Sequence, residues 1–580
     1  MENLRFILLA IAAVFGVLLY QSWQHDHPGK NAQSSRTQSR QASSESVNKA
    51  QSSTANASAP KASRNKSSRQ TSSVPGEGSQ SESGQRNIKS SQLIHVVTDN
   101  YRITINPRGG DIYRATLRNV PVSSNKPNTP LTLLKPGAHK FFRQTSRIFG
   151  PNTSRKTHRK YKAKKSTFQL KKNQDSLKVP LTWTGPNGRK ITKVFVFKRN
   201  SYRINLKTVV KNAGNSSWKV WNLVDYWRHG GSKSAHAWFI PSTFSGVGWY
   251  AQNSGNKGYS YHKRKTSALD KKPVDITQTG GWVAINEHYF LAAAIPGHKT
   301  KARFFAKKQT TQAAPNAFKT GFVTAPETIS PGHSTEFKTR LFVGPKLQNE
   351  LTNAAPGLDL TVDYGFMTVL ARPIFKLLSF LHSIVGNWGV AIILLTLIIK
   401  LLFYKLSEKQ YRSMARMRKF QPRMQQIKEQ YGDDRQQMQA KMMELYKKEG
   451  FNPLAGCWPM LVQAPVFIVL YWVLLESAEM RTAPFLWIND LSSPDPFFIL
   501  PVYFGITMFI QQRLTTSTAM DPLQQRLMQI MPIGLAVFFT FFPAGLVLYW
   551  CTNNTLSIAQ QWYIYRKLDT EGLGHKATKS

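Results

Sequence analysis

One apolar segment with a single charge decides the fold: Trp388-Gly-Val-Ala-Ile-Ile-Leu-Leu-Thr-Leu-Ile-Ile-Lys400-Leu-Leu-Phe-Tyr404. Its length lies within the range of a transmembrane helix, about 17 to 25 residues. At 1.5 Å per residue, Lys400 lies about 18 Å along the axis from Trp388 and about 6 Å from Tyr404. Its amine either extends to the cytoplasmic interface or faces a water-filled cavity. Thr396, one turn away on the same face, favours the polar cavity wall.

Further apolar segments indicate that the chain crosses a membrane several times. Leu4–Tyr20 has no small-x-small cleavage site after it, so we interpret it as an uncleaved signal-anchor rather than a removed signal peptide. Phe366–Val385 is amphipathic and is expected to lie in the membrane interface. Together with the anchor and the Lys400 segment, four more candidates give six spans: about 453–475, 497–512, 528–542 and 545–563. The fold class is therefore a polytopic α-helical membrane protein, which excludes a soluble cytosolic enzyme.

The last span carries a polar and aromatic stripe. Trp550, Asn553, Asn554 and Ser557 stand at i, i+3, i+4 and i+7, and Gln463 adds an amide to the 453–475 span. Such a stripe lines a polar cavity, or it joins helices by hydrogen bonds worth about 0.6 kcal/mol each. The same residue types serve both purposes, so the sequence leaves the two interpretations open.

Positive charge is concentrated in one part of the chain. The 580 residues carry a formal net charge of +48, from 78 Lys+Arg against 30 Asp+Glu. Residues 91–350 hold about 45 of these Lys/Arg and about 10 of the acids. A surface of this kind attracts nucleic acid, anionic lipid or acidic polymers, or it is a solvated face with no dedicated partner. We expect no specific nucleic acid partner.

The same part of the chain has the pattern of a β domain. Residues 25–90 are rich in Ser, Gln, Asn and Lys and are expected to form a disordered tether. From about 91 to 350, segments such as Tyr101–Ile105, Lys193–Phe197 and Tyr202–Leu206 alternate between apolar and polar residues, with frequent turn residues between them. This pattern predicts a large antiparallel β-sandwich.

Charge in the short loops predicts the orientation. The 405–450 loop carries twelve Lys/Arg against six acids, whereas the 476–496 loop carries one Arg and four acids. The C-terminal tail is also basic. By the positive-inside rule, both termini and the 405–450 loop are cytoplasmic and the β domain is extracytoplasmic.

The cytoplasmic segment is expected to form two amphipathic helices that break at Tyr431-Gly432-Asp433. Methionine side chains adapt to varied apolar partners, so those on these helices are candidates for contact with such partners. The alternative is an ordinary helical hairpin that packs on itself. The candidate residues are Met414, Met417, Met424, Met438 and Met442.

Signatures of common catalytic sites are missing. The sequence has no GxxxxGK[ST], no HExxH and no GxSxG within a span, and its two cysteines do not lie in a zinc-type cluster. We therefore expect no catalytic residues, no cofactor and no metal.

Several strings are similar to those of one family: Val362-Asp-Tyr-Gly365, Gly386-Asn-Trp-Gly389, Asn452-Pro-Leu-Ala-Gly-Cys-Trp-Pro459, Asp521-Pro-Leu-Gln-Gln525 and Phe542-Pro-Ala-Gly-Leu-Val-Leu-Tyr-Trp550. On these strings the chain resembles the YidC family of membrane protein insertases, in its Gram-negative form with a large periplasmic domain. The resemblance is specific from about 360 to 567 and loose from 91 to 350.

The resemblance implies a β-supersandwich outside the membrane and five core spans around a hydrophilic groove that carries a positive charge. That charge is usually arginine, and Lys400 stands at its position. Lysine keeps the charge but loses the planar fork of donors, so an electrostatic role is expected rather than bidentate binding of a carboxylate. Lys405 replaces a frequent proline, which predicts a less sharply broken helix end. The groove residues implied are Lys400, Thr396, Gln463, Trp550, Asn553 and Ser557.

The implied function is insertion and folding of inner-membrane proteins without nucleotide hydrolysis, alone or with the Sec translocon. Expected partners are nascent membrane proteins, membrane lipids and the ribosome. Two rival functions are a transporter or channel that uses Lys400, and a periplasmic binding or sugar-processing protein that the spans merely anchor. The expected parts are a signal-anchor span 1–23, tether 24–90, β domain 91–350, interfacial helix 357–386, second span 387–405, cytoplasmic hairpin 406–451, four further spans 452–565 and a basic tail 566–580.

Overall fold

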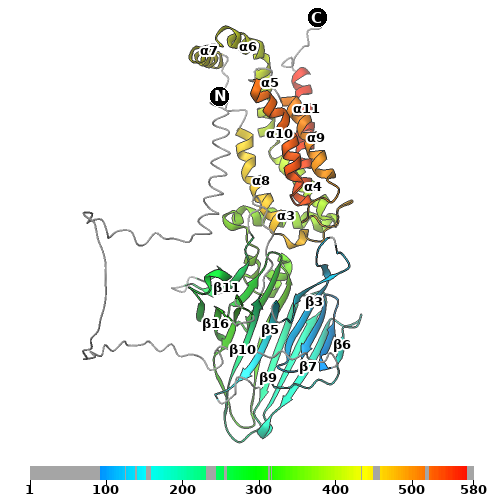
Figure 1. Ribbon diagram of the computed structural model, residues 1–580, viewed down its shortest axis with the longest axis vertical. Helices are drawn as coiled ribbons and strands as arrows, with labels where there is room; N and C mark the ends of the chain where they lie inside the picture. The colour runs from blue at the N-terminus through cyan, green and yellow to red at the C-terminus, as the bar shows by residue number, and fades with distance from the viewer. Residues whose placement is uncertain are drawn as a thin grey trace, which may run out of the picture. The chain divides into compact units, whose positions relative to one another are not determined.

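The computed structural model describes residues 92–570, apart from 125, 138–139, 152–158, 230–242, 254–257, 311–313, 315, 433, 449–457 and 516–521. The predicted signal-anchor 1–23 and tether 24–90 lie outside the described residues, as does most of the predicted tail 566–580. The described chain has a β-rich part followed by a helical part (Figure 1).

The β-rich part contains three sheets. The 5-stranded sheet has the order β4 (Pro130–Leu134), β3 (Asp111–Pro121), β2 (Tyr101–Asn106), β1 (Ile94–Val97), β6 (Thr167–Gln169). The 6-stranded sheet has the order β13 (Val274–Thr279), β16 (Lys301–Lys308), β17 (Phe318–Thr324), β10 (Trp218–His229), β18 (Glu327–Ile329), with β5 (Phe141–Phe149) paired to β10. The 8-stranded sheet has the order β12 (Tyr259–Lys265), β11 (Gly246–Gln252), β14 (Trp282–Asn286), β15 (Phe290–Pro296), β19 (Ser334–Pro345), β9 (Arg203–Lys211), β8 (Lys190–Lys198), β7 (Ser176–Thr184).

Alternating burial along the strands explains why these segments form sheets. In β8, Ile191, Lys193, Phe195 and Phe197 are buried while the residues between them are more exposed. A period of two places one set of side chains on the core face, as the sequence pattern predicted. The strand pairs are antiparallel except β1 with β6, which is parallel. The predicted β-rich domain is confirmed.

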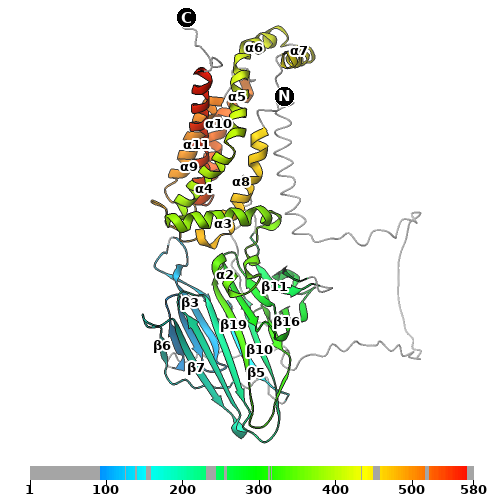
Figure 2. The same ribbon diagram turned by 180° about the vertical axis from the view of Figure 1, so that it is seen from behind.

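The helical part begins after β19, and its α-helices are α2 (Gln348–Ala354), α3 (Thr368–Val385), α4 (Trp388–Leu402), α5 (Tyr404–Lys419), α6 (Gln421–Gln430), α7 (Arg435–Lys448), α8 (Trp458–Glu476), α9 (Ile499–Thr515), α10 (Pro522–Phe539) and α11 (Ala544–Thr570). Short 3₁₀ turns are η2 (Pro186–Gly188), η3 (Thr266–Ala268), η4 (Leu358–Thr361), η5 (Gly365–Met367) and η7 (Ala478–Met480). Helix α3 ends at Gly386, whose φ of 68° is left-handed and suits glycine. Figure 2 shows α3 running across the ends of α4 and α8, which it contacts.

Length and composition identify fewer membrane spans than the sequence predicted. Among the described helices, only α3 is long and apolar enough by itself, and α4 with Tyr404–Ala415 adds a second if the pair is one bent span. Gln463–Glu476 and Gln529–Phe539 are apolar but shorter. Large apolar side chains nevertheless stay exposed on α9 and α10, including Val502, Ile506 and Ile533, as expected of faces that meet lipid. The six spans, and the interfacial position of α3, stay predictions.

Two local expectations about the cytoplasmic segment were wrong. The predicted break after the first helix is confirmed, since α6 ends at Gln430 and α7 begins at Arg435. The segment nevertheless forms three helices rather than two, because α5 and α6 are separate with Phe420 between them. Pro422 stands in the first turn of α6, where its missing N–H is tolerated, so the sequence suits a new helix that starts at Gln421. The end of α4 is also sharp without proline, since α4 and α5 meet at a 65° bend. Phe403 forms the bend with φ −92° and ψ 10°.

Polar contacts join the β-rich part to the segment that follows α8. Arg481 donates to the backbone carbonyls of Pro121 and Val122, each at 2.8 Å. The Glu479 carboxylate accepts the backbone N–H of Gln348 at 2.8 Å. Buried apolar residues of both parts also form one continuous cluster.

Candidate functional site

Lys400 lies inside the helical part rather than at its surface. The apolar sequence of α4 begins at Asn387, whose side chain accepts the backbone N–H of Val390 at 3.2 Å and caps the helix. Three turns further on, the Lys400 side chain is only 7% exposed. Its amine therefore does not extend to the helix end, and in this structure it faces the neighbouring helix α11.

Ser557 of α11 is the partner of this amine. Lys400 Nζ donates to Ser557 Oγ at 2.7 Å, and the Ser557 hydroxyl donates to the backbone carbonyl of Asn553 at 2.7 Å. Because a serine hydroxyl has one proton and that proton is used within the helix, its lone pairs are directed to the lysine. Among the described residues, no carboxylate lies within ion-pair distance of Lys400.

The polar cluster continues from α11 to α8. Gln463 Nε2 donates to Asn553 Oδ1 at 2.9 Å. Lys400, Ser557, Asn553 and Gln463 thus form one connected set on three helices, α4, α11 and α8. The structure brings together four of the six residues that the sequence selected for the groove.

The other two predicted groove residues lie apart from this set. Thr396 is buried and donates to the Ile392 carbonyl of its own helix at 2.7 Å, so its hydroxyl is satisfied within α4. Trp550 packs among aromatic rings, with centroids 4.7 Å from Phe467 and 5.8 Å from Phe539. Its buried indole Nε1–H has no hydrogen-bond partner in the described part of the chain.

Arrangement and composition limit the chemistry of this cluster. It presents one ammonium group, one hydroxyl and two amides. The Ser557 hydroxyl donates its proton to the Asn553 carbonyl and accepts from Lys400, so it is not arranged as a nucleophile with the lysine as its base. In the described ranges, no group of three or more His, Cys, Asp or Glu side chains is placed to hold a metal ion. The cluster can bind an anionic or polar group by hydrogen bonds and charge.

Comparisons with known proteins follow the same division of the chain. The family model described as "YidC periplasmic domain" matches residues 93–377, and the one described as "60Kd inner membrane protein" matches residues 380–571. A membrane protein insertase YidC from Thioalkalivibrio sulfidiphilus is 42% identical over 99% of this chain and 100% of its own length. The chain belongs to the YidC family of membrane protein insertases.

Other members of the YidC family are similar over most of their length. The insertase from Alkalilimnicola ehrlichii is 45% identical over 85% of this chain and 86% of its own. A crystal structure of an active YidC insertase with its first transmembrane domain resolved covers 82% of this chain and 93% of its own, at 18% identity and a TM-score of 0.39. The family predicted from the sequence is confirmed: the chain is an insertase of the bacterial inner membrane with a periplasmic domain, and it is not an enzyme.

Two residues that lie beside the polar cluster of Lys400 were not selected from the sequence. Gln560 Nε2 donates to the Lys400 carbonyl at 3.4 Å, and the Tyr411 hydroxyl donates to the Ser557 carbonyl at 3.4 Å. Gln560 continues the α11 stripe three residues beyond Ser557, so helical periodicity contained the signal. Tyr411 is on α5, and only the 65° bend after α4 brings it back to α11.

The five methionines predicted to contact clients occupy varied positions on α5, α6 and α7. Met424 is buried, Met438 and Met442 are half-buried, and Met414 packs on the small cluster of Tyr411, Ile564 and Leu568. The Met417 side chain lies outside the described side chains. Contact with clients stays a prediction for all five residues.

Proposed function

We propose that this insertase admits its clients through a hydrated groove whose positive charge is Lys400. In this proposal, six spans place both termini in the cytoplasm, and the groove opens toward the cytoplasm and the lipid. Gln463, Asn553 and Ser557 are its polar wall. Thr396 and Trp550, which are satisfied within their helix or packed among rings, support the wall rather than contact the client.

The physical problem for a client is the crossing of its polar tail. A spanning helix of apolar residues gains about 0.3 to 0.6 kcal/mol per residue on insertion, so no nucleotide is needed to drive it. A charge at the bilayer centre costs roughly 2.5 to 3.5 kcal/mol on the same scale. A hydrated groove that reaches partway across the membrane shortens the apolar barrier and lowers this cost.

One observation carries the proposal: Lys400 is buried, yet a single hydroxyl is its hydrogen-bond partner in the described residues. An ammonium group has three donors, so two remain for water or for a client. A buried cation that served only stability is expected to have a carboxylate partner, because an unpaired charge inside a protein is costly. The arrangement fits transient binding of an acidic client tail.

Lysine instead of arginine agrees with this role. The ammonium group is a compact, strongly hydrated charge and has no fixed fork of donors. It can hold a carboxylate briefly and release it, whereas bidentate binding would prolong the contact. The protein breaks no covalent bond of the client. It lowers the free-energy barrier to the entry of the client into the membrane.

The test is insertion in cells depleted of the native insertase, with short clients that carry acidic tails. Lys400→Ala is expected to lower their insertion at least severalfold, and Lys400→Arg to retain most of it. Lys405→Ala, which removes an exposed amine five residues later, is the matched control and should insert as wild type does. Equal insertion by Lys400→Ala and wild type would reject the electrostatic role.

Cytoplasmic and membrane partners belong to the same proposal. The basic helices α5, α6 and α7 are suited to the ribosome and to emerging clients, and the Sec translocon is the expected partner for larger clients. Crosslinks from Gln463 and Met424 to a stalled nascent chain would place the client along this route. A chain that crosslinks at neither residue while it is being inserted contradicts the route.

A further inference from the structure

The charge of the β domain is already near its upper limit at neutral pH. An ordinary domain has about 25% charged residues, so 260 residues carry roughly 32 of each sign. Its net charge would reach about +32 only after every carboxylate is protonated. Residues 91–350 of this chain reach about +35 at pH 7, with about 10 carboxylates and nine histidines left to protonate. Acid therefore changes the electrostatics of this domain less than those of an ordinary one.

Lys193 is a buried cation of this domain that is bonded mainly to backbone carbonyls, whereas the buried Arg228 pairs with the Glu287 carboxylate. Lys193, 1% exposed, donates to Gly109 O at 2.6 Å, Gly110 O at 3.2 Å and Ser146 O at 2.6 Å, and contacts Ser146 Oγ at 2.8 Å. The Asp111 carboxylate is further away, at 3.8 Å. The other charged or titratable groups that act on this amine are Arg147, Arg159 and the Tyr161 ring.

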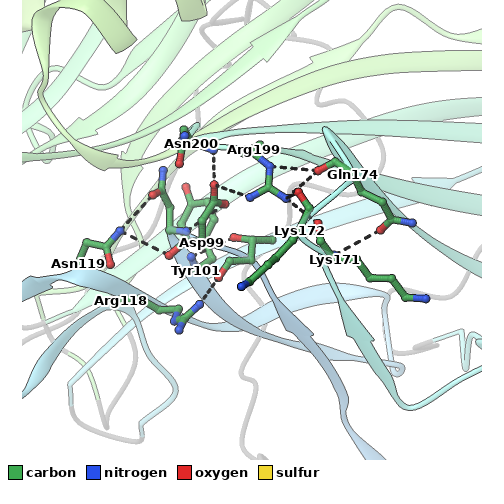
Figure 3. Close-up of polar contacts among 11 residues, drawn as sticks. Asp99, Tyr101, Arg118, Asn119, Lys171, Lys172, Gln174, Arg199 and Asn200 are labelled. Carbon is green, nitrogen blue, oxygen red and sulfur yellow. Dashed lines mark hydrogen bonds and ion pairs between the residues drawn. The ribbon is translucent and has the colours of Figure 1, made fainter.

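Arg199 shows the same arrangement at the junction of two sheets (Figure 3). It lies just after β8 and donates to three carbonyls of the segment between β6 and β7: Lys171 O at 2.6 Å, Lys172 O at 3.1 Å and Gln174 O at 2.9 Å. The carboxylate that faces it, Asp99, is 4.0 Å away, and Asp175 accepts only its backbone N–H, through a carbonyl. Arg199 thus joins two parts of the domain through groups that do not titrate.

Five other arginines of the domain also donate to carbonyls, each in a turn or at the end of an element. The pairs are Arg118 with Thr98, Arg143 with Gly137, Arg203 with Asn353, Arg264 with Lys272 and Pro273, and Arg340 with Ala354. Ordinary domains lose stability in acid because carboxylates bonded in the native state become protonated. Carbonyl oxygens keep their hydrogen bonds through that pH range.

We infer that the periplasmic β domain is built to stay folded in a strongly acidic medium. Many of its cations are held by carbonyls, and its carboxylates are few. Two groups oppose the inference: the ion pair of Lys319 with the buried Asp225 at 2.9 Å, and His288, whose pKa burial lowers to about 4. Asp111 fits this inference, because burial raises its pKa and protonation then favours the folded state. Ion pairs that depend on carboxylates do occur, such as Arg303 with Asp275 at 2.6 Å, and they supply an internal control.

The first test is hydrogen exchange of the full chain in detergent between pH 7 and pH 2, with protection factors measured for peptides of β8, β9 and β10. We expect protection to persist down to pH 2. Loss at pH 4 or above, where ordinary carboxylates protonate, would overturn the inference.

The second test compares two arginine variants in the same assay. Arg199→Gln should increase local opening by a similar factor, roughly tenfold, at pH 7 and at pH 2, because carbonyl partners do not titrate. Arg303→Gln should increase opening less at pH 2 than at pH 7, because protonation of Asp275 competes with its ion pair to Arg303 in acid. If the effect of Arg199→Gln also decreases in acid, the inference fails. Arg118→Gln repeats the measurement at an independent site should Arg199→Gln not fold.

A third measurement separates acid tolerance from a binding role of the basic surface. The pH at which protection is lost is compared with and without vesicles that contain phosphatidylglycerol. The inference predicts a low value in both cases. A domain that opens near pH 4 alone and is protected only by the anionic vesicles would show that the charge serves binding, and would overturn the inference.

Discussion

Replacing Ser557 by alanine measures whether water reaches the Lys400 amine. The hydroxyl is the acceptor for Nζ at 2.7 Å, and the amine is 7% exposed. In a dry pocket the loss of a hydrogen bond to a charged group costs about 1.5 to 3 kcal/mol. In a hydrated groove water takes the place of the hydroxyl, and the cost is expected to be about 0.6 kcal/mol or less, as for other hydrogen bonds between membrane helices.

Thermal unfolding in detergent, followed through the helical part, distinguishes these values. For a unit of roughly 200 residues, 1 kcal/mol shifts Tm by about 2 to 4 °C. We predict a decrease of about 2 °C or less for Ser557→Ala, and a similarly small coupling to Lys400→Met in a double-mutant cycle. Thr552→Ala is the matched control, since Thr552 donates to the Leu548 carbonyl at 2.8 Å in the same helix without touching a charge. A Tm loss for Ser557→Ala that exceeds the control by 5 °C or more would refute the hydrated groove.

Three further substitutions test the packing and the pH response of the structure. Burial lowers the pKa of His288 to about 4, and this imidazole is bonded to the Leu475 carbonyl at 3.0 Å. Because the pKa of His288 is lowered in the folded state, the folded protein loses stability as the pH falls from about 6.5 to 4. The free energy of unfolding of His288→Gln, measured with denaturant, should therefore exceed that of the wild type by up to about 3 kcal/mol at pH 4 and should equal it at pH 7.5. Burial raises the pKa of Glu479 to about 7, so its charge costs stability above that pH and not below about 4.5. Glu479→Gln should therefore stabilise the protein at pH 8.5 and not at pH 4, and the opposite order would contradict the sign. Gly389→Ala would place its Cβ 2.2 Å from the Phe485 ring, so it should lower stability by about 1 to 3 kcal/mol, and an unchanged Tm would show that this contact is looser.

Local pattern was enough to predict the elements and the polar face of α11. The i, i+3, i+4, i+7 spacing of its polar residues is a property of one helix, and the alternation in the β strands is likewise local. The start of α6 could also have been predicted, because a proline in the first helical turn, here Pro422, is a helix-start signal. Only the break at Gly432-Asp433 was used to predict the helices of this segment.

Long-range pairings could not be predicted in the same way. That Lys400 meets Ser557, and that Arg481 meets the carbonyls of Pro121 and Val122, depends on how distant segments pack. Every residue has a backbone carbonyl, so the sequence does not show which carbonyls accept hydrogen bonds from Lys193 and Arg199. The charge surplus of the β domain could be counted, but its consequence depended on these partners.

Accessibility of position 557 to a water-soluble reagent tests the hydrated groove most directly. In a background that replaces both native cysteines, Cys457 and Cys551, a Ser557→Cys variant in inner-membrane vesicles is treated with a charged maleimide, and Ile506→Cys on the exposed apolar face of α9 is the lipid-facing control. We predict rapid labelling at 557, slow labelling at 506, and protection of 557 when a stalled client chain is bound. Labelling at 557 as slow as at 506 would show that water does not reach the Lys400 amine, and would contradict the account.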